Sequence, residues 1–443
     1  MTASNRGLRC AALLALCAAA TFAAADASAQ DVLIKGARVH TAGDAGTLER
    51  ADVLVRDGVI RAIGADVAAP AGVTVFDAAG LPLTPSLFGG LSGLGIEEVS
   101  GEPGTVDNTL ALNGPMTVPS IEPEWRPEFD VLPAFNPRSA AIGVNRVAGI
   151  GWTVLAPGAM AGGSFVAGQG AAVRLDGGFD AALDASRSLF IDLGSDAKAL
   201  AGGSRAGQYM LLEQALREAR PAPAAGMVAM VPGHGLLTPL GRETMMRYAR
   251  GGRVVFHVDR AADIRQALSL AKRAGFEPVI AGGVEAWVVA DELAQAKVPV
   301  LLDALENLPG NFDRLAARLD NAARLHAAGV AVAFTQGGDA THNARKVRQL
   351  AGNAVANGLP WEAALAGLTR VPAQVFGVAD QIGSIAVGQR ADLVLWSGDP
   401  LEVTTVARQI WFDGKAAPMR SRQTQLRDRY LRPAGPLPRA YSH

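Results

Sequence analysis

The chain has 443 residues, 49% of them hydrophobic, and its 41 Lys and Arg against 42 Asp and Glu give a formal net charge of −1. This balance excludes the clustered basic excess that binding to nucleic acid or to an anionic membrane needs. The length and apolar content predict a folded chain with one large, barrel-sized domain and a smaller one. Six histidines leave few imidazoles for a metal site.

Residues 1–29 have the composition of an export signal. Arg6 and Arg9 precede an uncharged apolar stretch over residues 10–25, and the small residues 27–29 resemble a signal-peptidase site. That stretch of about 16 residues is shorter than the roughly 20 that span a bilayer as a helix. We therefore expect a cleaved signal peptide, an exported periplasmic protein, and no membrane contact after cleavage. An uncleaved anchor is the alternative.

Both cysteines of the chain lie in this segment, at Cys10 and Cys17. Cleavage would leave a mature chain without any thiol. Such a chain has no disulfide, no thiolate metal ligand and no cysteine nucleophile.

Short β-type runs occupy both ends of the remaining chain. In residues 30–84 turn residues divide the runs, and Asp57-Gly58 is a strong hairpin signal. Residues 377–420 have the same character, so we expect the two segments to form one small composite β-sandwich, with residues 85–376 inserted between them. Residues 421–443 are polar and contain proline, which predicts a tail. The runs of the first segment are Val32–Ile34, Ala37–His40, Ala51–Val55 and Val59–Ile63.

Apolar runs alternate with amphipathic stretches through residues 85–376. The clearest helix is Ala262–Ala274, in which Ile264, Leu268 and Ala271 fall on one stripe. This alternation predicts an α/β fold, a TIM-type (β/α)8 barrel of parallel strands, with functional side chains at the carboxyl ends of the strands. The runs expected to be buried strands are 152–155, 227–231, 254–256, 278–280, 298–302 and 330–334.

Motifs at both ends of the chain carry a resemblance to a known family. Val32–Val39 and the hairpin Asp57–Gly64 resemble its opening strands, while Pro372-Ala373, Ile382–Ile385 and Ala391–Val394 resemble its closing motifs. The chain is thus similar to the amidohydrolase superfamily, in particular to its imidazolonepropionase-like branch. The resemblance implies a metal-dependent hydrolase that cleaves non-peptide C–N bonds in amides or cyclic amides and takes a small-molecule substrate.

The resemblance also implies a set of metal ligands, which is incomplete here. In the family, one or two divalent ions of the zinc type, held by His and Asp at strand ends, activate a water molecule. His257 stands at the strand-5 ligand position. Leu91 and Gly93 replace the paired histidines of strand 1, and Gly282 replaces the histidine of strand 6. The metal site is therefore degenerate, with His257 as its best-matched ligand.

The strand-8 position and the residues that follow it complete the candidate site. Without a gap Gly337 takes the place of the family's aspartate, and with a slip of two residues Asp339 does. We predict Asp339 as a metal ligand beside His257, and Asp339 and His342 as catalytic residues. Glu285 and Arg345 are predicted to bind substrate.

Each of these candidates has a structural alternative. Asp339, Thr341 or Asn343 could cap the helix that follows them. His257 could be a hydrogen-bonded histidine at a strand end. The glycine-rich stretch 161–170 lacks the Lys-Ser/Thr of a phosphate-binding loop and is expected to shape the rim of a pocket.

Three hypotheses for function remain. The first is a working hydrolase in which His257 and Asp339 converge within about 5 Å, so that one ion could touch both. The second is a catalytically silent protein that binds a ligand or supports an active paralogue, with a homodimer or a paralogue as partner. The third, from another class, is a structural envelope component.

Glu97 and Glu98 are possible paired acids, with a solvated loop as the alternative.

Overall fold

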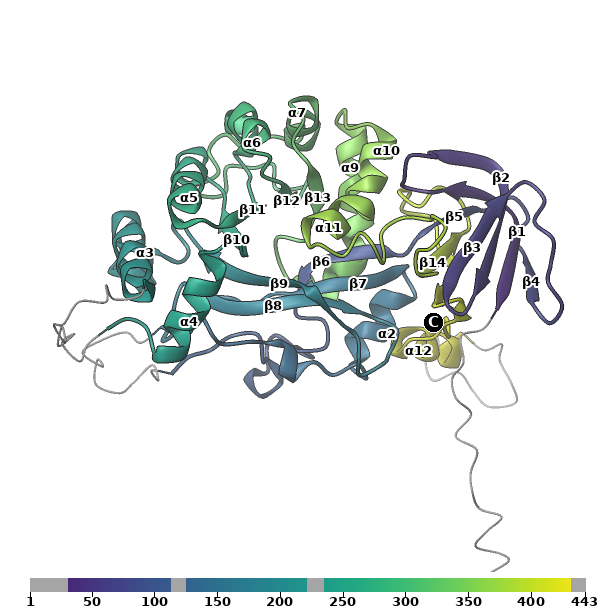
Figure 1. Cartoon of the computed structure of the whole chain (residues 1–443), viewed down its shortest axis with the longest axis horizontal. Helices are drawn as coiled ribbons and strands as arrows, with labels where there is room; N and C mark the ends of the chain where they lie inside the picture. The colour runs from purple at the N-terminus through teal and green to yellow at the C-terminus, as the bar shows by residue number, and fades with distance from the viewer. Residues whose placement is uncertain (1–30, 113–124, 221–234, 432–443) are drawn as a thin grey trace, which may run out of the picture.

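The computed structural model describes residues 31–112, 125–220 and 235–431 (Figure 1). Two eight-stranded sheets organise these residues. The smaller part lies at one side of the molecule, and the larger part carries most of the helices around its sheet (Figure 1). The segments 1–30 and 227–231, where a signal peptide and one buried strand are predicted, fall outside the described residues.

The first sheet is built from both ends of the chain. Its strand order is β16-β15-β14-β5-β1-β2-β3, with β4 paired to β1. The two ends meet where β14 pairs antiparallel with β5, through Leu393 opposite Pro85. The composite β part that the end motifs predict is therefore confirmed, as a single sheet. Its strands are β1 (Val32–His40), β2 (Thr47–Arg56), β3 (Val59–Gly64), β4 (Thr74–Asp77), β5 (Pro82–Pro85), β14 (Leu393–Trp396), β15 (Ala407–Phe412) and β16 (Lys415–Ala416).

The second sheet forms a nearly closed barrel. Its order β13-β12-β11-β10-β9-β8-β7-β6 follows the chain. Between β6 and β13 the Leu91 N–H donates to the Thr335 hydroxyl at 2.9 Å, so a side chain bridges this seam. The predicted barrel architecture is confirmed. The strands are β6 (Leu87–Ser92), β7 (Ile150–Leu155), β8 (Val166–Arg174), β9 (Ala182–Asp192), β10 (Arg253–Val258), β11 (Glu277–Gly282), β12 (Val300–Leu302) and β13 (Val332–Phe334).

One strand of the barrel departs from the all-parallel prediction. β8 pairs antiparallel with both β7 and β9, whereas the other neighbours in the barrel sheet are parallel. The glycine-rich stretch 161–170 therefore leads into a fully buried strand rather than forming only a rim. Gly168 illustrates why the sequence of β8 does not look like that of a strand, since this glycine is required by the local structure. Its φ is +125°, and a Cβ atom there would lie 2.6 Å from the Phe129 carbonyl oxygen, so both the backbone and the space demand glycine.

Helices cover the outside of the barrel (Figure 1). The predicted helix 262–274 is confirmed as α5, which ends at Gly275 with a φ of +79° and buries Ile264, Ala267 and Leu270. The α-helices are α2 (Ala140–Arg146), α3 (Arg205–Ala219), α4 (Pro239–Tyr248), α5 (Ala261–Ala274), α6 (Ala290–Gln295), α7 (Asn321–Ala327), α8 (Ala340–Asn343), α9 (Val347–Ala356), α10 (Trp361–Ala366), α11 (Arg370–Val375) and α12 (Arg422–Tyr430). Short 3-10 helices are η1 (Pro103–Thr105), η2 (Leu132–Ala134), η3 (Lys198–Ala201), η4 (Ala286–Val289) and η5 (Ala344–Lys346).

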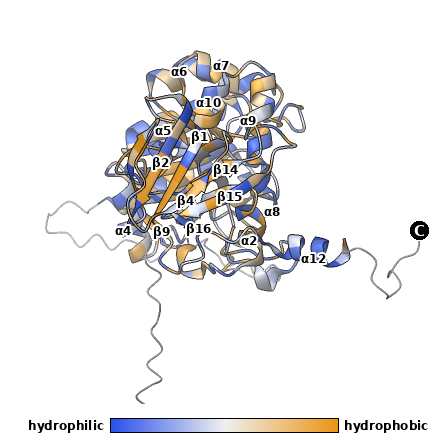
Figure 2. Ribbon diagram, turned by 90° about the vertical axis from the view of Figure 1, so that its right-hand side faces the viewer, coloured by the Kyte–Doolittle hydropathy of each residue, from blue (hydrophilic) through white to orange (hydrophobic). Residues whose placement is uncertain are grey.

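The segment predicted to be a polar tail begins with a helix. Ser421 caps α12 in a reciprocal arrangement with Thr424, and no residue of the helix is buried. Figure 2 shows α12 at the edge of the molecule, away from the hydrophobic strands. In the described part of the chain no helix is long and apolar enough to cross a membrane.

A buried arginine joins the two sheets. Arg174, at the end of β8, donates from Nε and Nη2 to both oxygens of Asp392 at 2.9 Å, and from Nη2 to Asp413 at 2.8 Å. Its side chain is 5% exposed and Asp392 is 4% exposed. Asp392 immediately precedes β14, and Asp413 follows β15. An ion pair shielded from water thus spans the barrel and the composite sheet, beside apolar side chains of both sheets that share one core.

Candidate functional site

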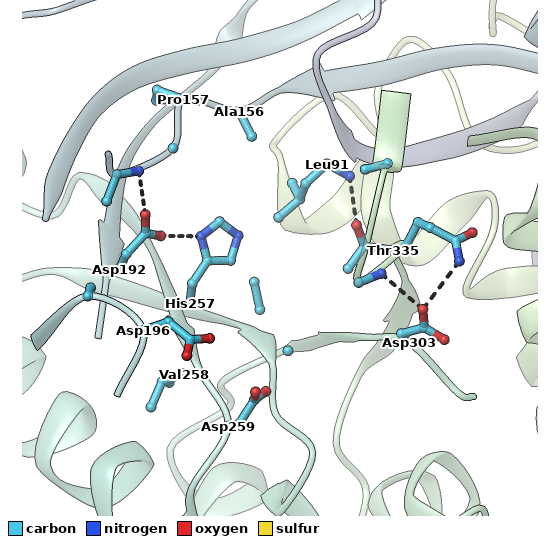
Figure 3. Close-up of a pocket in the computed structure, with 18 of the residues that line it drawn as sticks. Leu91, Ala156, Pro157, Asp192, Asp196, His257, Val258, Asp259, Asp303 and Thr335 are labelled. Carbon is cyan, nitrogen blue, oxygen red and sulfur yellow. Dashed lines mark hydrogen bonds and ion pairs between the residues drawn. The ribbon is translucent and has the colours of Figure 1, made fainter. Parts of the chain in front are cut away.

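A cavity of about 870 Å³ opens at the carboxyl ends of the barrel strands. This is where a barrel fold places functional side chains. Residues from β6, β9, β10, β11 and the loops after β12 and β13 line it. The large apolar side chains of the strands fill the barrel core, so that polar groups gather at the mouth (Figure 3).

His257 and Asp192 form the best-defined polar pair in the cavity. They stand opposite one another in the parallel pairing of β10 with β9, which puts both side chains on the same face. The His257 Nδ1–H donates to Asp192 Oδ1 at 2.5 Å, and Asp192 Oδ2 accepts from the Ala159 N–H at 2.7 Å. Because Nδ1 is engaged by the carboxylate, Nε2 is the ring nitrogen turned to the cavity (Figure 3).

The carboxylate of Asp192 sets the protonation of His257. Burial alone lowers the pKa of the imidazole, but the charge and hydrogen bond of Asp192 outweigh it and raise the pKa above the ordinary 6.5. A histidine with a raised pKa stabilises the fold fully below pH 6.5, and this contribution is lost as the pH rises through its folded pKa.

We expect an NMR titration of His257 to show a midpoint above 6.5. Asp192→Asn should lower this midpoint, because it removes the negative charge while keeping the size of the side chain. A His257 midpoint at or below 6.5 in the unaltered protein would contradict the pairing.

A second acidic group lies beside the pair. Asp259 follows β10, and its Oδ2 accepts from Arg314 Nε at 2.7 Å. Burial raises the pKa of Asp259 in spite of Arg314, and the nearby charge of Asp196 raises it further. Arg314 is shared, because its Nη1 also contacts Glu306 at 2.7 Å. The mouth of the barrel therefore carries more negative than positive charge.

The structure places two of the predicted site residues at the cavity and the other three outside its lining. His257 and Asp339 both line it, whereas His342, Glu285 and Arg345 do not. Asp339 lies five residues beyond the end of β13, at a φ of +44°, and contacts His342 at 3.1 Å. Its side chain makes no capping hydrogen bond to α8.

The predicted substrate-binding residues have structural partners. The two oxygens of Glu285 accept from the N–H groups of Ala261 and Ala316, at 3.0 and 2.9 Å, which ties the start of α5 to a neighbouring loop. The guanidinium of Arg345 donates to the carbonyl of His342 at 2.9 Å. Neither side chain reaches the cavity lining.

Several cavity residues are missing from the sequence prediction. Asp192, Asp259 and Asp303 lie at the ends of β9, β10 and β12, and Thr335 follows β13. Asp192 directly follows the apolar run 189–191, which is the signal that could have revealed it as a strand-end residue. β9 itself is not among the predicted strands.

A metal of the zinc type, which is typical of the superfamily, does not fit the residues that the structure describes. Structural and catalytic zinc sites use at least three protein ligands. Among residues 31–112, 125–220 and 235–431, no group of three or more His, Cys, Asp or Glu is arranged to hold an ion. Leu91 packs with Phe88 and Trp152, and Gly93 and Gly282 have no ligand atoms.

The fold is a barrel with a cavity at the carboxyl ends of its strands, and similarity to known proteins identifies its family. Residues 175–419, more than half of the chain, match the model of the amidohydrolase family, and the chain belongs to that family. A stretch of 59 residues is 46% identical to Amidohydrolase tasK from Hapsidospora irregularis; it is 13% of this chain and about 6% of the length of that relative.

Solved structures show the same fold over most of the chain. An amidohydrolase from Thermotoga maritima MSB8 superposes with a TM-score of 0.75 at 25% identity, covering 88% of this chain and all of that one. A triazine hydrolase from Arthobacter aurescens has a TM-score of 0.51 at 16% identity and covers 90% of this chain and 97% of its own. The second likeness shows the fold alone.

Proposed function

We propose that the protein hydrolyses non-peptide C–N bonds in small amides or cyclic amides. Family membership and the likeness to the Thermotoga maritima amidohydrolase support this class of reaction. The observation that carries it is the His257–Asp192 pair, which presents one imidazole nitrogen to a cavity large enough for a small substrate. The end motifs support the imidazolonepropionase-like branch as the narrower placement.

The pair can move the proton that this reaction needs. Hydrolysis adds the oxygen of water to the carbonyl carbon, breaks the C–N bond, and transfers a proton from water to the leaving nitrogen. His257 Nε2 would accept that proton and then donate it to the nitrogen. Asp192 keeps Nδ1 protonated, orients the ring and stabilises the imidazolium that forms between the two steps.

Incubation with a panel of lactams, cyclic ureides and linear N-acyl amines tests the proposal. We expect one class to gain the mass of one water in a reaction that needs His257, followed by mass spectrometry. The alternative is a catalytically silent subunit that binds a ligand or supports an active paralogue. Leu91, Gly93 and Gly282, which stand where the family resemblance implies histidine ligands, favour it. Ligands that raise the melting temperature without being turned over would establish that alternative.

The charge of the cavity predicts which ligands enter. Eight carboxylates line it against His257 and Arg314, so an anionic ligand meets repulsion. For matched amides that differ only in one ammonium, methyl or carboxylate group, we expect the carboxylate to bind at least about tenfold more weakly, measured by calorimetry at low salt. Equal affinities for the three would contradict this. The carboxylates are Glu97, Asp192, Asp196, Asp259, Asp303, Glu306, Asp313 and Asp339.

Export and assembly are proposals as well. We propose that the protein is periplasmic, on the pattern of residues 1–29, and that it acts as a homodimer or beside a paralogue. Fractionation of cells together with the N-terminal sequence of the mature chain tests the first. Light scattering of the purified protein tests the second.

A further inference from the structure

A buried hydrogen-bonded pair of side chains fills the space beside Gly93, one of the positions that the family resemblance matches to a metal ligand. A Cβ atom at Gly93 would lie 2.8 Å from Glu97 Oε2 and 2.8 Å from Thr341 Oγ1, closer than Cβ atoms approach such oxygens. A side chain at this position could enter only if the Glu97 carboxylate and the Thr341 hydroxyl moved aside, which would disturb the hydrogen bonds that they make.

The two neighbours are themselves bonded to each other. The Thr341 hydroxyl donates to Glu97 Oε2 at 2.8 Å and accepts from the Gly93 N–H at 3.0 Å. Glu97 is 8% and Thr341 is 2% exposed. Asn145, which is fully buried, extends the chain by donating to the Thr341 carbonyl at 3.3 Å. A buried polar side chain is costly unless its hydrogen-bond partners stay in position.

This network crosses the seam of the barrel. Glu97 and Gly93 follow β6, whereas Thr341 lies in α8, after β13. Within the described residues β6 and β13 are not neighbours in the sheet order, and the Leu91–Thr335 hydrogen bond lies at the same seam. The cavity wall at this seam therefore depends on side-chain hydrogen bonds.

Gly282, the second glycine at a position that the family resemblance matches to a ligand, also lies in surroundings that leave little room for a side chain. Gly282 has a φ of +87°, a conformation that side chains other than glycine rarely adopt. A Cβ atom there would lie 2.5 Å from Asp259 Oδ1, and Asp259 is held by Arg314. Two of the three substituted positions thus have surroundings adapted to glycine.

We infer that the hydrogen-bonded pair Glu97–Thr341 acts as a lock: without any bound ion, it fixes the cavity wall at Gly93, the position that the family resemblance matches to a metal ligand. The wall then keeps its shape through Gly93, Thr341 and Glu97. Thr341 is a positioning residue in this assignment. The role of the Glu97–Thr341 pair in the cavity wall does not depend on which reaction takes place in the cavity. The inference therefore goes beyond the proposed function.

The first test breaks the lock in the full chain. Thr341→Val keeps the shape of the side chain and removes its hydroxyl, and Thr341→Ser keeps the hydroxyl. We expect Thr341→Val to lower the melting temperature by at least about 2 °C and to speed amide exchange in residues 91–97, and Thr341→Ser to restore slow exchange there. Chelator treatment of the unaltered protein should change neither quantity. Unchanged exchange in Thr341→Val, or faster exchange on chelation, would overturn the lock.

The second test attempts to restore the ligand. Gly93→His should take up less than about a tenth of an equivalent of zinc, and Gly93→Ala should already melt lower than the parent. Gly338→Ala is the matched control, because Gly338 has no heavy atom within 4 Å of a Cβ position and no positive φ. If Gly93→Ala melts like Gly338→Ala, or if Gly93→His binds one zinc at parental stability, the space is open and the inference fails.

Discussion

Arg174→Met is expected to lower the free energy of unfolding by about 3–5 kcal/mol, the cost of leaving a buried ion pair without one partner. Arg174 holds both oxygens of Asp392, and the two side chains are 5% and 4% exposed. Removing the cation leaves the Asp392 carboxylate shielded from water, with the N–H group of Asp413 as the one remaining donor to its side chain among the described residues. Chemical denaturation followed by circular dichroism measures the loss.

Two further variants separate the buried charge from simple packing. Arg390→Met, at a side chain that is 35% exposed and also binds Asp413, should cost about 1 kcal/mol or less. Arg174→Met combined with Asp392→Leu should recover part of the loss, because the most deeply buried carboxylate is then removed together with its cation. A single variant Arg174→Met as stable as the parent would show that the pair does not join the two sheets energetically.

His257→Gln is expected to lower kcat/KM by about 10²–10⁴-fold on the amide that the panel identifies, the range that one acid–base group contributes. The glutamine side chain would keep polar contact with Asp192 but could not exchange a proton at neutral pH. Asp192→Asn should lower the rate less and move the pH profile, because the ring loses the charge that raises its pKa.

His342→Gln is the matched control, at a histidine outside the cavity lining. It should leave kcat/KM unchanged. If His342→Gln or Asp339→Asn abolished turnover while His257→Gln retained it, catalysis would lie in the group after β13, as the sequence pattern alone proposes.

Much of the architecture can be predicted from the sequence, because turns and helices depend mainly on neighbouring residues. Asp57-Gly58 closes the hairpin between β2 and β3 at positive φ, as an Asp-Gly pair should. The helix predicted over Ala262–Ala274 is α5, whose boundaries Ala261–Ala274 differ by one residue. β8 and β9 escape prediction, because glycines interrupt β8, and Asp184 and Arg187 give β9 a polar pattern.

The site is less predictable because strand register, rather than local sequence, creates it. His257 is visible from the resemblance, but its partner Asp192 lies 65 residues earlier in the chain and meets it only through the pairing of β9 with β10. Glu285 follows β11, a position suited to a ligand-binding residue, yet backbone N–H groups of Ala261 and Ala316 take both its oxygens. The position of Glu285 in the sequence does not reveal that backbone N–H groups, rather than a ligand, bind its carboxylate.

The strand that runs against its neighbours also bears on how the barrel folds. β7, β8 and β9 pair through short connections within residues 150–192, whereas the seam joins Leu91 to Thr335 across 244 residues. The entropy lost on closing a loop grows with its length, and contacts between distant residues slow folding. The antiparallel strands β7–β9 are therefore the part of the barrel that the chain can assemble most readily by itself. The seam in the cavity wall is the part with the greatest entropic cost of closure.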